Sequence, residues 1–519
     1  FSLTGGNKKY SGVGGQAVME GVMMKNEDRY AVAVRKPDHT IDVKVSTFKE
    51  TIKNKKLRRL PFIRGVINFI ESLILGMQTL MYSASFFEDD EDEKKKKEAA
   101  GYQAEKVIFD TTAIAQKTVV YQGMRKEYHT DKTEKITMQD ILSEKATVEE
   151  LVAQLSTEEL AEFCVGTLRA DGGEVVGNAS YTVPGAAGDT SSVCKESRGI
   201  KNMILADGPA GLRLQPHFKT KKDGTLLPGG EVMGDAYTPF NPNIDEKEVD
   251  NYYQYCTAIP IGWALAQSWN TELVEKAGDM VGSEMEQFHV DLWLAPALNI
   301  HRNPLCGRNF EYYSEDPLVA GMCAAADTRG IQSHAGIGTS IKHFAANNQE
   351  DNRMYVNEHI SERAMREIYL KGFEIAVKTA QPMTIMSSYN LVNGVHTANS
   401  HDLLTAAARD EWGFAGYVMT DWGTSEDMSG LFAYKYNLKY GHSTSRECVL
   451  AGNDLQMPGQ QGNRQEIVAS VADGTLPLGQ LQTCAYRILN VVLQSLAYDD
   501  CKPYGDQFDL EEAVTVTKA

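Results

Sequence analysis

The 519-residue sequence has no Cys-X-X-Cys pair, and none of its eight cysteines falls within the first 163 residues. This distribution excludes a zinc-binding framework and a small disulfide scaffold. The opening residues FSLTGGNKKY contain no apolar run typical of a secretory signal, so none is expected. Together these absences predict reduced, buried thiols in a cytoplasmic protein.

Basic residues are scarce, with 52 Lys and Arg against 70 Asp and Glu and a net charge of −18. Because nucleic-acid binding needs clustered positive charge, no nucleic-acid partner is expected. The deficit is uneven, since residues 1–100 carry a net charge of +4 and the remaining 419 carry −22. Two such compositions in one chain indicate two parts of different origin.

Long apolar runs are missing as well. Within the first 100 residues, the longest uncharged stretch, Ser72 to Phe87, has 16 residues, whereas a membrane-spanning helix needs about 20. Apolar residues recur every three to four positions over 62–81, which predicts a helix. Basic residues at 55, 56, 58 and 59 precede it. We therefore expect a weak membrane-surface contact through 55–87, or alternatively a core helix with a solvated basic flank.

Composition also suggests where the chain divides. The charged block 88–98 is typical of a solvated linker, and short apolar runs at 31–34 and 41–45 predict a hairpin. The expected segments are an N-terminal fragment with one apolar helix (1–87), a charged linker (88–104), the remnant of a β-domain (105–144), a barrel (145–500) and a C-terminal tail (501–519).

From about residue 200, short apolar runs alternate with helical stretches. This alternation predicts an α/β fold, a (β/α)8 TIM-type barrel joined to a small unrelated α+β N-terminal segment. No Gly-X-Gly-X-X-Gly follows a strand, which disfavours an open dinucleotide-binding sheet. Capping-box spacing at Thr137 and Ser156 predicts two helix starts. The expected strands are Met203–Ala206, Leu292–Ile300, Gly338–Phe344, Pro382–Tyr389, Tyr417–Thr420 and Cys448–Gln456, and the expected helices include Thr271–Gln287, Glu362–Thr379 and Ser400–Glu411.

Polar and charged residues end five of these runs. In a β/α barrel the strand ends meet at one mouth, where carboxylates, cations and aromatic rings together suit a sugar. A metal site is the weaker alternative, with Asp207, His301, His343 and Asp421 as ligands. The sequence has no His-Glu-X-X-His pattern, and Lys342 beside His343 would repel a cation. No metal and no cofactor is expected.

Four motifs resemble the barrel domain of glycoside hydrolase family 3, the β-glucosidase group. They are Asp207-Gly-Pro-Ala-Gly-Leu-Arg213, Gly307-Arg-Asn-Phe-Glu311 with Ser314-Glu-Asp-Pro317, Lys342-His-Phe344, and Val418-Met-Thr-Asp-Trp422. The resemblance implies a retaining glycosidase acting on β-linked terminal sugars, with Asp421 as nucleophile. It implies that Trp422 walls the sugar subsite, and that the hydroxyls are held by Asp207, Arg308, Lys342, His343 and Tyr389.

The general acid is the missing part of this resemblance. Family β-glucosidases carry it on a separate α/β sandwich domain, and we expect no segment of these 519 residues to supply that domain. The N-acetylglucosaminidase branch uses a histidine on a barrel loop, but this sequence reads KHFAANNQEDNR there. We therefore expect an impaired hydrolase, with a catalytically silent carbohydrate-binding barrel as the alternative. We also expect the mouth above Asp421 and Trp422 to open to solvent on one side.

Residues 10–98 resemble the start of the uncharacterised YqhQ-like bacterial family. The resemblance rests on Gly14-Gly-Gln-Ala-Val-Met-Glu-Gly-Val-Met-Met24 and Ala31-Val-Ala-Val-Arg-Lys-Pro37. It assigns no chemistry to this segment, and it leaves open a third function, a membrane-associated scaffold. A homo-oligomer is also possible on the sequence.

Overall fold

The computed structural model describes most of the chain outside a long connecting region and the C-terminal end. The described residues are 13–18, 21–26, 29–36, 38, 40–47, 74–75, 77–83, 85, 126–167, 180, 182–231, 237–425 and 441–495. They fall into two compact units, 1–110 and 111–519. The strands expected within 105–122 lie outside the described residues.

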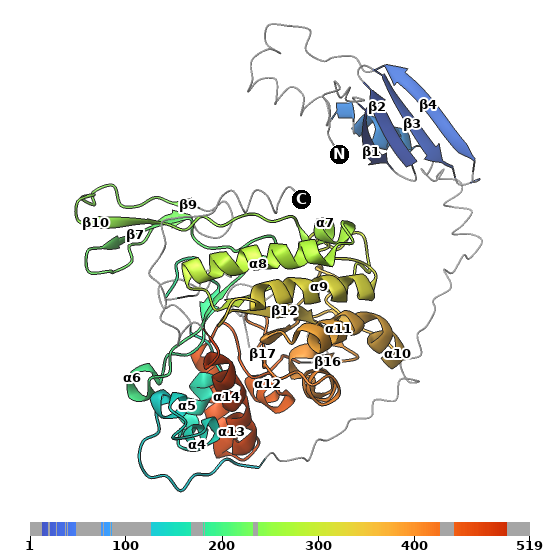
Figure 1. Ribbon diagram of the computed structural model, residues 1–519. Helices are drawn as coiled ribbons and strands as arrows, with labels where there is room; N and C mark the ends of the chain where they lie inside the picture. Colours follow the sequence, from blue (N-terminus) through green and yellow to red (C-terminus); the bar gives the residue numbers. More distant parts are fainter. Residues whose placement is uncertain are drawn as a thin grey trace, which may run out of the picture. The chain divides into compact units, whose positions relative to one another are not determined.

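The N-terminal unit is an antiparallel meander of four strands in the order β1-β2-β3-β4 (Figure 1). The strands are β1 (Val13–Val18), β2 (Gly21–Asn26), β3 (Arg29–Arg35) and β4 (Ile41–Thr47). The expected hairpin is confirmed, because β3 pairs with β4 across the turn at 36–40. A short helix at 77–83 accompanies the sheet, and the unit's small core consists of Met23, Val32, Val34 and Leu75.

The expected helix over 62–81 is described only from residue 74 onwards. Across the described part of the chain, no helix is both long and apolar enough to cross a membrane.

The second unit is built on a six-stranded sheet in the order β17-β14-β12-β11-β6-β5, so the expected α/β fold is confirmed. All neighbouring strands are parallel except β5, which runs antiparallel to β6. The strands are β5 (Gly188–Asp189), β6 (Ile204–Ala206), β11 (Leu292–Trp293), β12 (Gly338–Phe344), β14 (Thr384–Ser387) and β17 (Tyr417–Met419).

Single bridges continue the sheet beyond both of its edges. Met419 in β17 pairs with Leu455, and the adjacent Gln456 pairs with Val165. Thr167, two residues further on, pairs with Asp189 in β5. The short segments around 165 and 455 therefore lie between the two edge strands of the sheet.

Helices α8 (Thr271–Phe288), α9 (Pro317–Gln332) and α11 (Lys371–Ala380) lie side by side along one side of the sheet (Figure 1). Helix α8 begins where the Asn270 side chain accepts from two backbone N–H groups, and α9 begins at Asp316 with proline in its first turn. Side-chain caps of this kind satisfy backbone donors that a helix start leaves unpaired.

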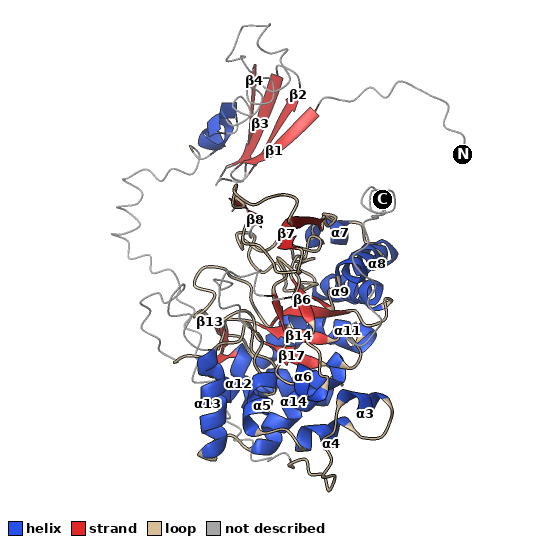
Figure 2. Cartoon of the chain, turned by 90° about the vertical axis from the view of Figure 1, so that its left-hand side faces the viewer, coloured by secondary structure: helices blue, strands red, loops and turns tan. Residues whose placement is uncertain are grey.

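Short helices flank these elements (Figure 2). The capping boxes at Thr137 and Ser156 are confirmed as the starts of α3 (Met138–Leu142) and α5 (Thr157–Phe163). The remaining helices are α4 (Val148–Ala153), α6 (Lys195–Arg198), α7 (Gly262–Gln267), α10 (Glu362–Ala364), α12 (Ser445–Ala451), α13 (Gln461–Ala472), α14 (Leu478–Val492), the π-helices η2 (Met365–Tyr369) and η4 (Asp402–Glu411), and the 3-10 helix η3 (Thr397–Asn399).

Two expected strands are only partly correct. Of Leu292–Ile300, only Leu292–Trp293 forms a strand, with a single further bridge from Ala297 to Lys342. The expected strand Cys448–Gln456 is wrong in its first half. Residues 448–451 belong to α12, and only Leu455 and Gln456 pair in the sheet. The helix begins at Thr444, whose side chain accepts from the Glu447 N–H, and it ends at Gly452 with φ of 85°. Apolar runs of this length are ambiguous, and here the cap residues on both sides favour a helix.

An antiparallel ribbon that follows β6 was not predicted from the sequence. This ribbon pairs β7 (His217–Lys221) with β10 (Val249–Tyr253). Further short strands are β8 (Gly230–Glu231), β9 (Tyr237–Thr238), β13 (Asn357–Glu358), β15 (Leu391–Val392) and β16 (Val395–His396). The seven described cysteines are free; five of them are buried, and Cys256 and Cys306 are partly exposed.

Candidate active site

Four strands of the six-stranded sheet carry most of the predicted site residues at or near their ends. Asp207 directly follows β6, and Lys342 and His343 are among the last three residues of β12. Tyr389 and Asp421 each lie two residues beyond the end of their strands, β14 and β17. Because parallel strands end at one edge of a sheet, these side chains gather there.

Asp207 is held by two cations. Lys342 Nζ lies 2.7 Å from Asp207 Oδ1, and Arg213 Nη2 lies 2.6 Å from Oδ2. Burial acts to raise the pKa of Asp207, but the charges of Lys342 and Arg213 outweigh it and hold this pKa far below its ordinary value. Asp207 is therefore a permanent anion, suited to accept hydrogen bonds and unsuited to donate a proton.

Asp421 is a buried carboxylate among cations. Its Oδ1 accepts the Trp422 backbone N–H at 2.7 Å. Burial raises the pKa of Asp421, and the charges of Arg308, Arg353 and Lys342 oppose that rise. These cations favour the ionised form that a nucleophile requires.

His343 lies beside Asp421 but does not form an ion pair with it, because the imidazole is neutral. Its Nε2 lies 3.7 Å from Asp421 Oδ2, and its Nδ1 lies 3.3 Å from the Tyr312 hydroxyl. Burial and the positive charges of Arg308, Lys342 and Arg353 hold the pKa of His343 well below its ordinary value. Neutral His343 can therefore hydrogen-bond a substrate hydroxyl next to the Asp421 carboxylate.

Arg308, which was predicted, and Arg353, which was not, both act on Asp421 electrostatically. Arg308 is ion-paired with Glu311, three residues along the same loop. Arg353 is ion-paired with Glu350 at 2.8 Å and places its guanidinium 5.0 Å from the centre of the Tyr389 ring. Because Arg353 lies ten residues beyond the Lys342-His343 pair in an irregular loop, no strand-end pattern in the sequence could mark it.

Asn299 and Tyr312, which were also not predicted as site residues, both contact His343. Asn299 Oδ1 accepts the His343 backbone N–H at 2.8 Å, and its Nδ2 donates to the His343 carbonyl at 2.9 Å. The fully buried Tyr312 covers the ring from the side, with the ring planes at 68°. Asn299 therefore fixes the backbone of His343, and Tyr312 packs against its ring.

Trp422 is only 3% exposed and packs in the main core cluster. Its Nε1 donates to the Ala187 carbonyl at 3.1 Å, and its own carbonyl accepts the Tyr389 hydroxyl at 2.7 Å. Its contribution to the wall of a sugar subsite stays a prediction. So does the open mouth, because residues 426–440, just beyond this segment, lie outside the described residues.

The cluster balances its charges. It holds as many carboxylates as cations, namely Asp207, Glu311, Glu350 and Asp421 against Arg213, Arg308, Lys342 and Arg353. A binding site for phosphate would instead carry an excess of positive charge. Paired carboxylates and cations beside Tyr389 offer the acceptors, donors and aromatic surface that a neutral sugar uses.

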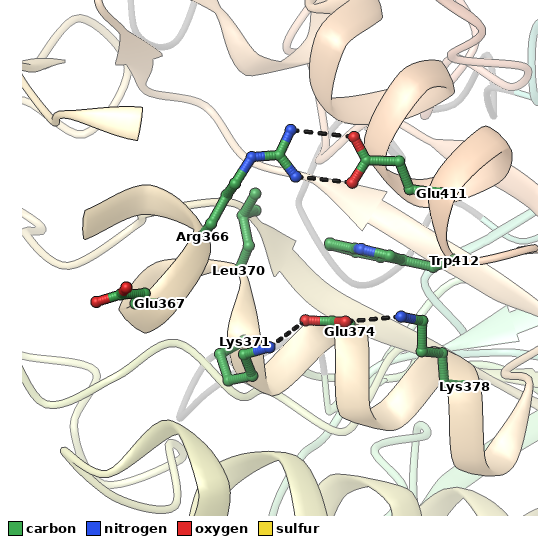
Figure 3. A pocket seen from close by; sticks show the side chains of 8 residues that line it. All are labelled: Arg366, Glu367, Leu370, Lys371, Glu374, Lys378, Glu411 and Trp412. Atoms are coloured by element: carbon green, nitrogen blue, oxygen red, sulfur yellow. Dashed lines mark hydrogen bonds and ion pairs between the residues drawn. The ribbon is translucent and has the colours of Figure 1, made fainter. Parts of the chain in front are cut away.

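A separate hollow of about 330 Å³ opens on the outer helices, between η2, α11 and the end of η4 (Figure 3). None of the predicted site residues lines it. Arg366 makes a two-bond pair with Glu411, and Glu374 bridges Lys371 and Lys378. The carboxylates there already satisfy these cations, so the hollow resembles a structural ion-pair network.

These features define a class: an α/β protein whose strand ends form a charge-balanced polar site with a buried carboxylate. Residues 244–491 match the glycosyl hydrolase family 3 N terminal domain, which confirms the resemblance to that family for this part of the chain. Residues 60–137 match a protein family of unknown function, DUF1385, which confirms the second resemblance. That match extends beyond the predicted linker into 105–144, and the segment boundaries stay predictions.

Known proteins with similar sequences are glycosidases. An exo-alpha-(1->6)-L-arabinopyranosidase of Bifidobacterium breve is 40% identical over 336 residues, which is 65% of this chain and 38% of the relative. A beta-glucosidase of Ruminococcus albus is 36% identical over 367 residues, 70% of this chain and 33% of the relative. The chain thus spans between about a third and two fifths of the length of these relatives.

Solved structures agree with this likeness. The beta-glucosidase 3B of Thermotoga neapolitana in complex with alpha-D-glucose is 39% identical, with a TM-score of 0.58 over 71% of this chain and 46% of that one. A family 3 beta-glucosidase of Bifidobacterium adolescentis is 35% identical, with a TM-score of 0.51 over 70% and 43%.

Proposed function

We propose that this chain supplies the sugar-binding and nucleophile part of a retaining β-glucosidase-type glycosidase. The observation that carries the proposal is the buried Asp421 at the end of β17, surrounded by Arg308, Arg353, Lys342 and His343. The bridges beyond β17 and β5 support a sheet closed into a barrel, with one antiparallel position at β5. The terminal sugar would enter at the carboxyl ends of the strands.

In the proposed reaction, a carboxylate oxygen of Asp421 attacks the anomeric carbon as the bond to the leaving oxygen breaks. The product is a glycosyl ester of Asp421, which water then hydrolyses with net retention. Asp207 and Lys342 would hold substrate hydroxyls, and neutral His343 would donate to the hydroxyl nearest the attacked carbon.

The second carboxyl group of a retaining enzyme must be able to carry a proton. The other three carboxylates of the described cluster are each bound to a cation: Asp207 to Lys342 and Arg213, Glu311 to Arg308, and Glu350 to Arg353. We therefore propose that none of them is the general acid, and that the cluster alone favours substrates that need little protonation.

Leaving-group dependence tests this proposal. We expect the 519-residue chain to cleave 2,4-dinitrophenyl β-glucoside but to hydrolyse cellobiose more slowly by a factor on the order of 10²–10⁴, the usual contribution of acid catalysis. Added azide should accelerate turnover and yield the β-glucosyl azide, because azide needs no base to attack the glycosyl ester. Cellobiose turnover close to that of the aryl glycoside would instead place a general acid within this chain.

A covalent label tests the same proposal without turnover. We expect 2,4-dinitrophenyl 2-deoxy-2-fluoro-β-glucoside to modify Asp421, as identified by peptide mass spectrometry. Glucose binding without any label would support the silent carbohydrate-binding barrel, and a label on another residue would remove Asp421 from its proposed role.

Substrate binding gives the next prediction. Lys342→Ala and Asp207→Ala should each weaken glucose binding by about 1–3 kcal/mol, the scale of a lost charged hydrogen bond, as measured by calorimetry. The matched control is Lys371→Ala, which removes a lysine paired with Glu374 in the outer hollow. The control should bind glucose as the wild type does; unchanged affinity in both site variants would assign the pocket to another ligand.

The pH dependence of glycosylation follows from Asp421. Only the carboxylate attacks, so the rate rises with pH through the pKa of Asp421, which burial raises above its ordinary value of 3.8. Because Arg353 opposes that rise, Arg353→Met should move the acidic limb of kcat/KM to higher pH. The matched change Arg363→Met, at a largely exposed arginine on α10, should leave the limb in place. A limb that stays fixed in Arg353→Met would contradict the electrostatic role.

A further inference from the structure

The described part of the N-terminal unit exposes more large apolar side chains than it buries. Its core has four buried residues. Seven more are exposed: Met24, Ile41, Val43, Val45, Met77, Leu80 and Met81. Scattered exposed apolar residues are ordinary, but several on one element of a small unit indicate a surface that binds something.

Three of these residues lie on one strand at the edge of the sheet. Ile41, Val43 and Val45 in β4 are 64%, 60% and 68% exposed. They alternate with Asp42 and Lys44, which face the helix side, where both contact Tyr82. In the part of the chain that the structure describes, β4 pairs with β3 alone and forms the outer edge of the sheet (Figure 1).

The backbone of β4 has one bonded side and one open side. The Lys36 N–H donates to the Thr40 carbonyl at the turn. Because bonded and non-bonded pairs alternate along an antiparallel ladder, the even-numbered residues from Asp42 bond to β3. The N–H and C=O groups of Ile41, Val43 and Val45 then point outward.

Natural edge strands usually carry a proline, a bulge or an inward charge that prevents further pairing. Strand β4 is seven residues long, contains no proline and pairs with β3 in unbroken register. The inward charges of β4, Asp42 and Lys44, are both in contact with Tyr82. With neither a proline nor a bulge, this edge can serve as a template for another strand.

The sequence of β4 is complementary to itself when reversed about Val43. An antiparallel copy places Val43 opposite Val43, Ile41 opposite Val45, and Asp42 opposite Lys44. The three outward-pointing residues fall in the bonded positions of this register, so each contributes its N–H and C=O. Apolar pairs and opposite charges directly across a ladder are both stabilising.

We propose that two copies of this chain associate through β4, antiparallel and centred on Val43, to form one continuous eight-stranded sheet. Such an interface is isologous, so the same patch serves both copies and the assembly closes as a dimer. The charge match of Asp42 with Lys44 of the other copy favours this occupant over an anionic lipid surface, which would repel the Asp42 carboxylate. The inference is independent of the proposed glycosidase function.

The first test is the mass of the full chain in solution. Light scattering after size exclusion should give twice the 57.4 kDa of one chain. Val43→Lys should shift the species to one chain, because it places two ammonium groups opposite each other. The matched control, Met24→Lys, adds the same charge on an exposed residue of β2 and should leave the dimer intact.

Cross-linking tests the register on the folded wild-type background. Val43→Cys should form an intermolecular disulfide under mild oxidation, because bonded antiparallel pairs have a Cα separation of about 5.5 Å, within disulfide range. Val45→Cys should not, since its copies would lie more than about 13 Å apart at 3.4 Å per residue. The wild type, with its native cysteines, gives the background.

Several outcomes would overturn the proposal. One is a wild type that remains a single chain at all accessible concentrations, whether or not it sediments with anionic vesicles. Another is a dimer lost in Met24→Lys, which would indicate packing of sheet faces. A third is cross-linking of Val45→Cys in preference to Val43→Cys, which would assign another register.

Discussion

Asp421→Ala should lower the rate of glycosylation by 2,4-dinitrophenyl β-glucoside by a factor on the order of 10⁴ or more, the scale on which covalent enzymes lose activity without their nucleophile. The effect is large because no other described carboxylate of the cluster is free of a cation, so none can replace the attacking oxygen.

The stereochemistry of rescue makes this prediction specific. In Asp421→Ala, azide can occupy the space left by the carboxylate and attack the anomeric carbon directly, with the dinitrophenolate as leaving group. One displacement inverts the centre and gives the α-glucosyl azide, whereas the wild type, through two displacements, gives the β-azide. Product analysis by NMR distinguishes the two.

Two controls separate chemistry from folding. Asp421→Asn keeps an oxygen that can accept the Trp422 N–H but cannot attack, so it should be as inactive as the alanine variant while melting like the wild type. Asp410→Ala, at an exposed position near the end of η4, should keep full activity. An Asp421→Ala protein that retains more than a few per cent of activity would exclude Asp421 as nucleophile.

The strand ends of the second unit could be predicted because each is a local signal. The Gly338–Phe344 run matches β12 residue for residue, and Tyr417–Thr420 contains β17. Polar residues that follow such runs meet at one sheet edge whatever the loops between them do. Asp207, Lys342, His343 and Asp421 are connected in the structure for that reason.

Most of the site residues that could not be predicted reach the site through contacts between parts of the chain that are distant in sequence. Arg353 enters from an irregular loop. Arg213 is an exception, because it ends the Asp207–Arg213 motif and pairs with Asp207 only six residues before it. Tyr312 and Asn299 act on His343, from 31 and 44 residues away in the sequence. No local periodicity marks such contacts, because they depend on how loops fold over the sheet edge.

The π-helical geometry of two segments also could not be predicted from the sequence. The expected helix at Glu362–Thr379 divides into α10, the π-helix η2 and α11. The expected helix at Ser400–Glu411 is largely a π-helix, η4. Both carry ordinary helical periodicity, and a π-type turn differs by one residue in its bonding, which packing decides and composition does not.

Asp454→Ala should destabilise the second unit by about 3–5 kcal/mol, the scale for breaking a buried ion network. Asp454 is fully buried between two guanidinium groups, with Arg409 Nη2 2.5 Å from Oδ2 and Arg487 Nη1 2.9 Å from Oδ1. Oδ2 also accepts the Val418 backbone N–H at 2.8 Å. One carboxylate thus joins η4, α14 and the strand that carries Asp421.

Removing this carboxylate leaves two buried cations and one buried N–H without their acceptor, and each is costly in a low-dielectric interior. Thermal unfolding followed by circular dichroism should therefore show a markedly lower transition for Asp454→Ala. Asp473→Ala, which removes an exposed carboxylate that accepts only from Thr475 at the end of α13, should change the transition little.

A triple variant separates the loss of the carboxylate from the burden of the unpaired cations. Replacing the network by apolar groups of similar size, as in Arg409→Met, Asp454→Leu and Arg487→Met together, should recover most of the stability that Asp454→Ala loses. Recovery would show that the cost comes from the stranded guanidinium groups. A triple variant as unstable as Asp454→Ala would instead mean that the hydrogen bond to Val418 and the exact fit of the carboxylate hold β17 in place, and glycosylation by Asp421 should then fall in both variants.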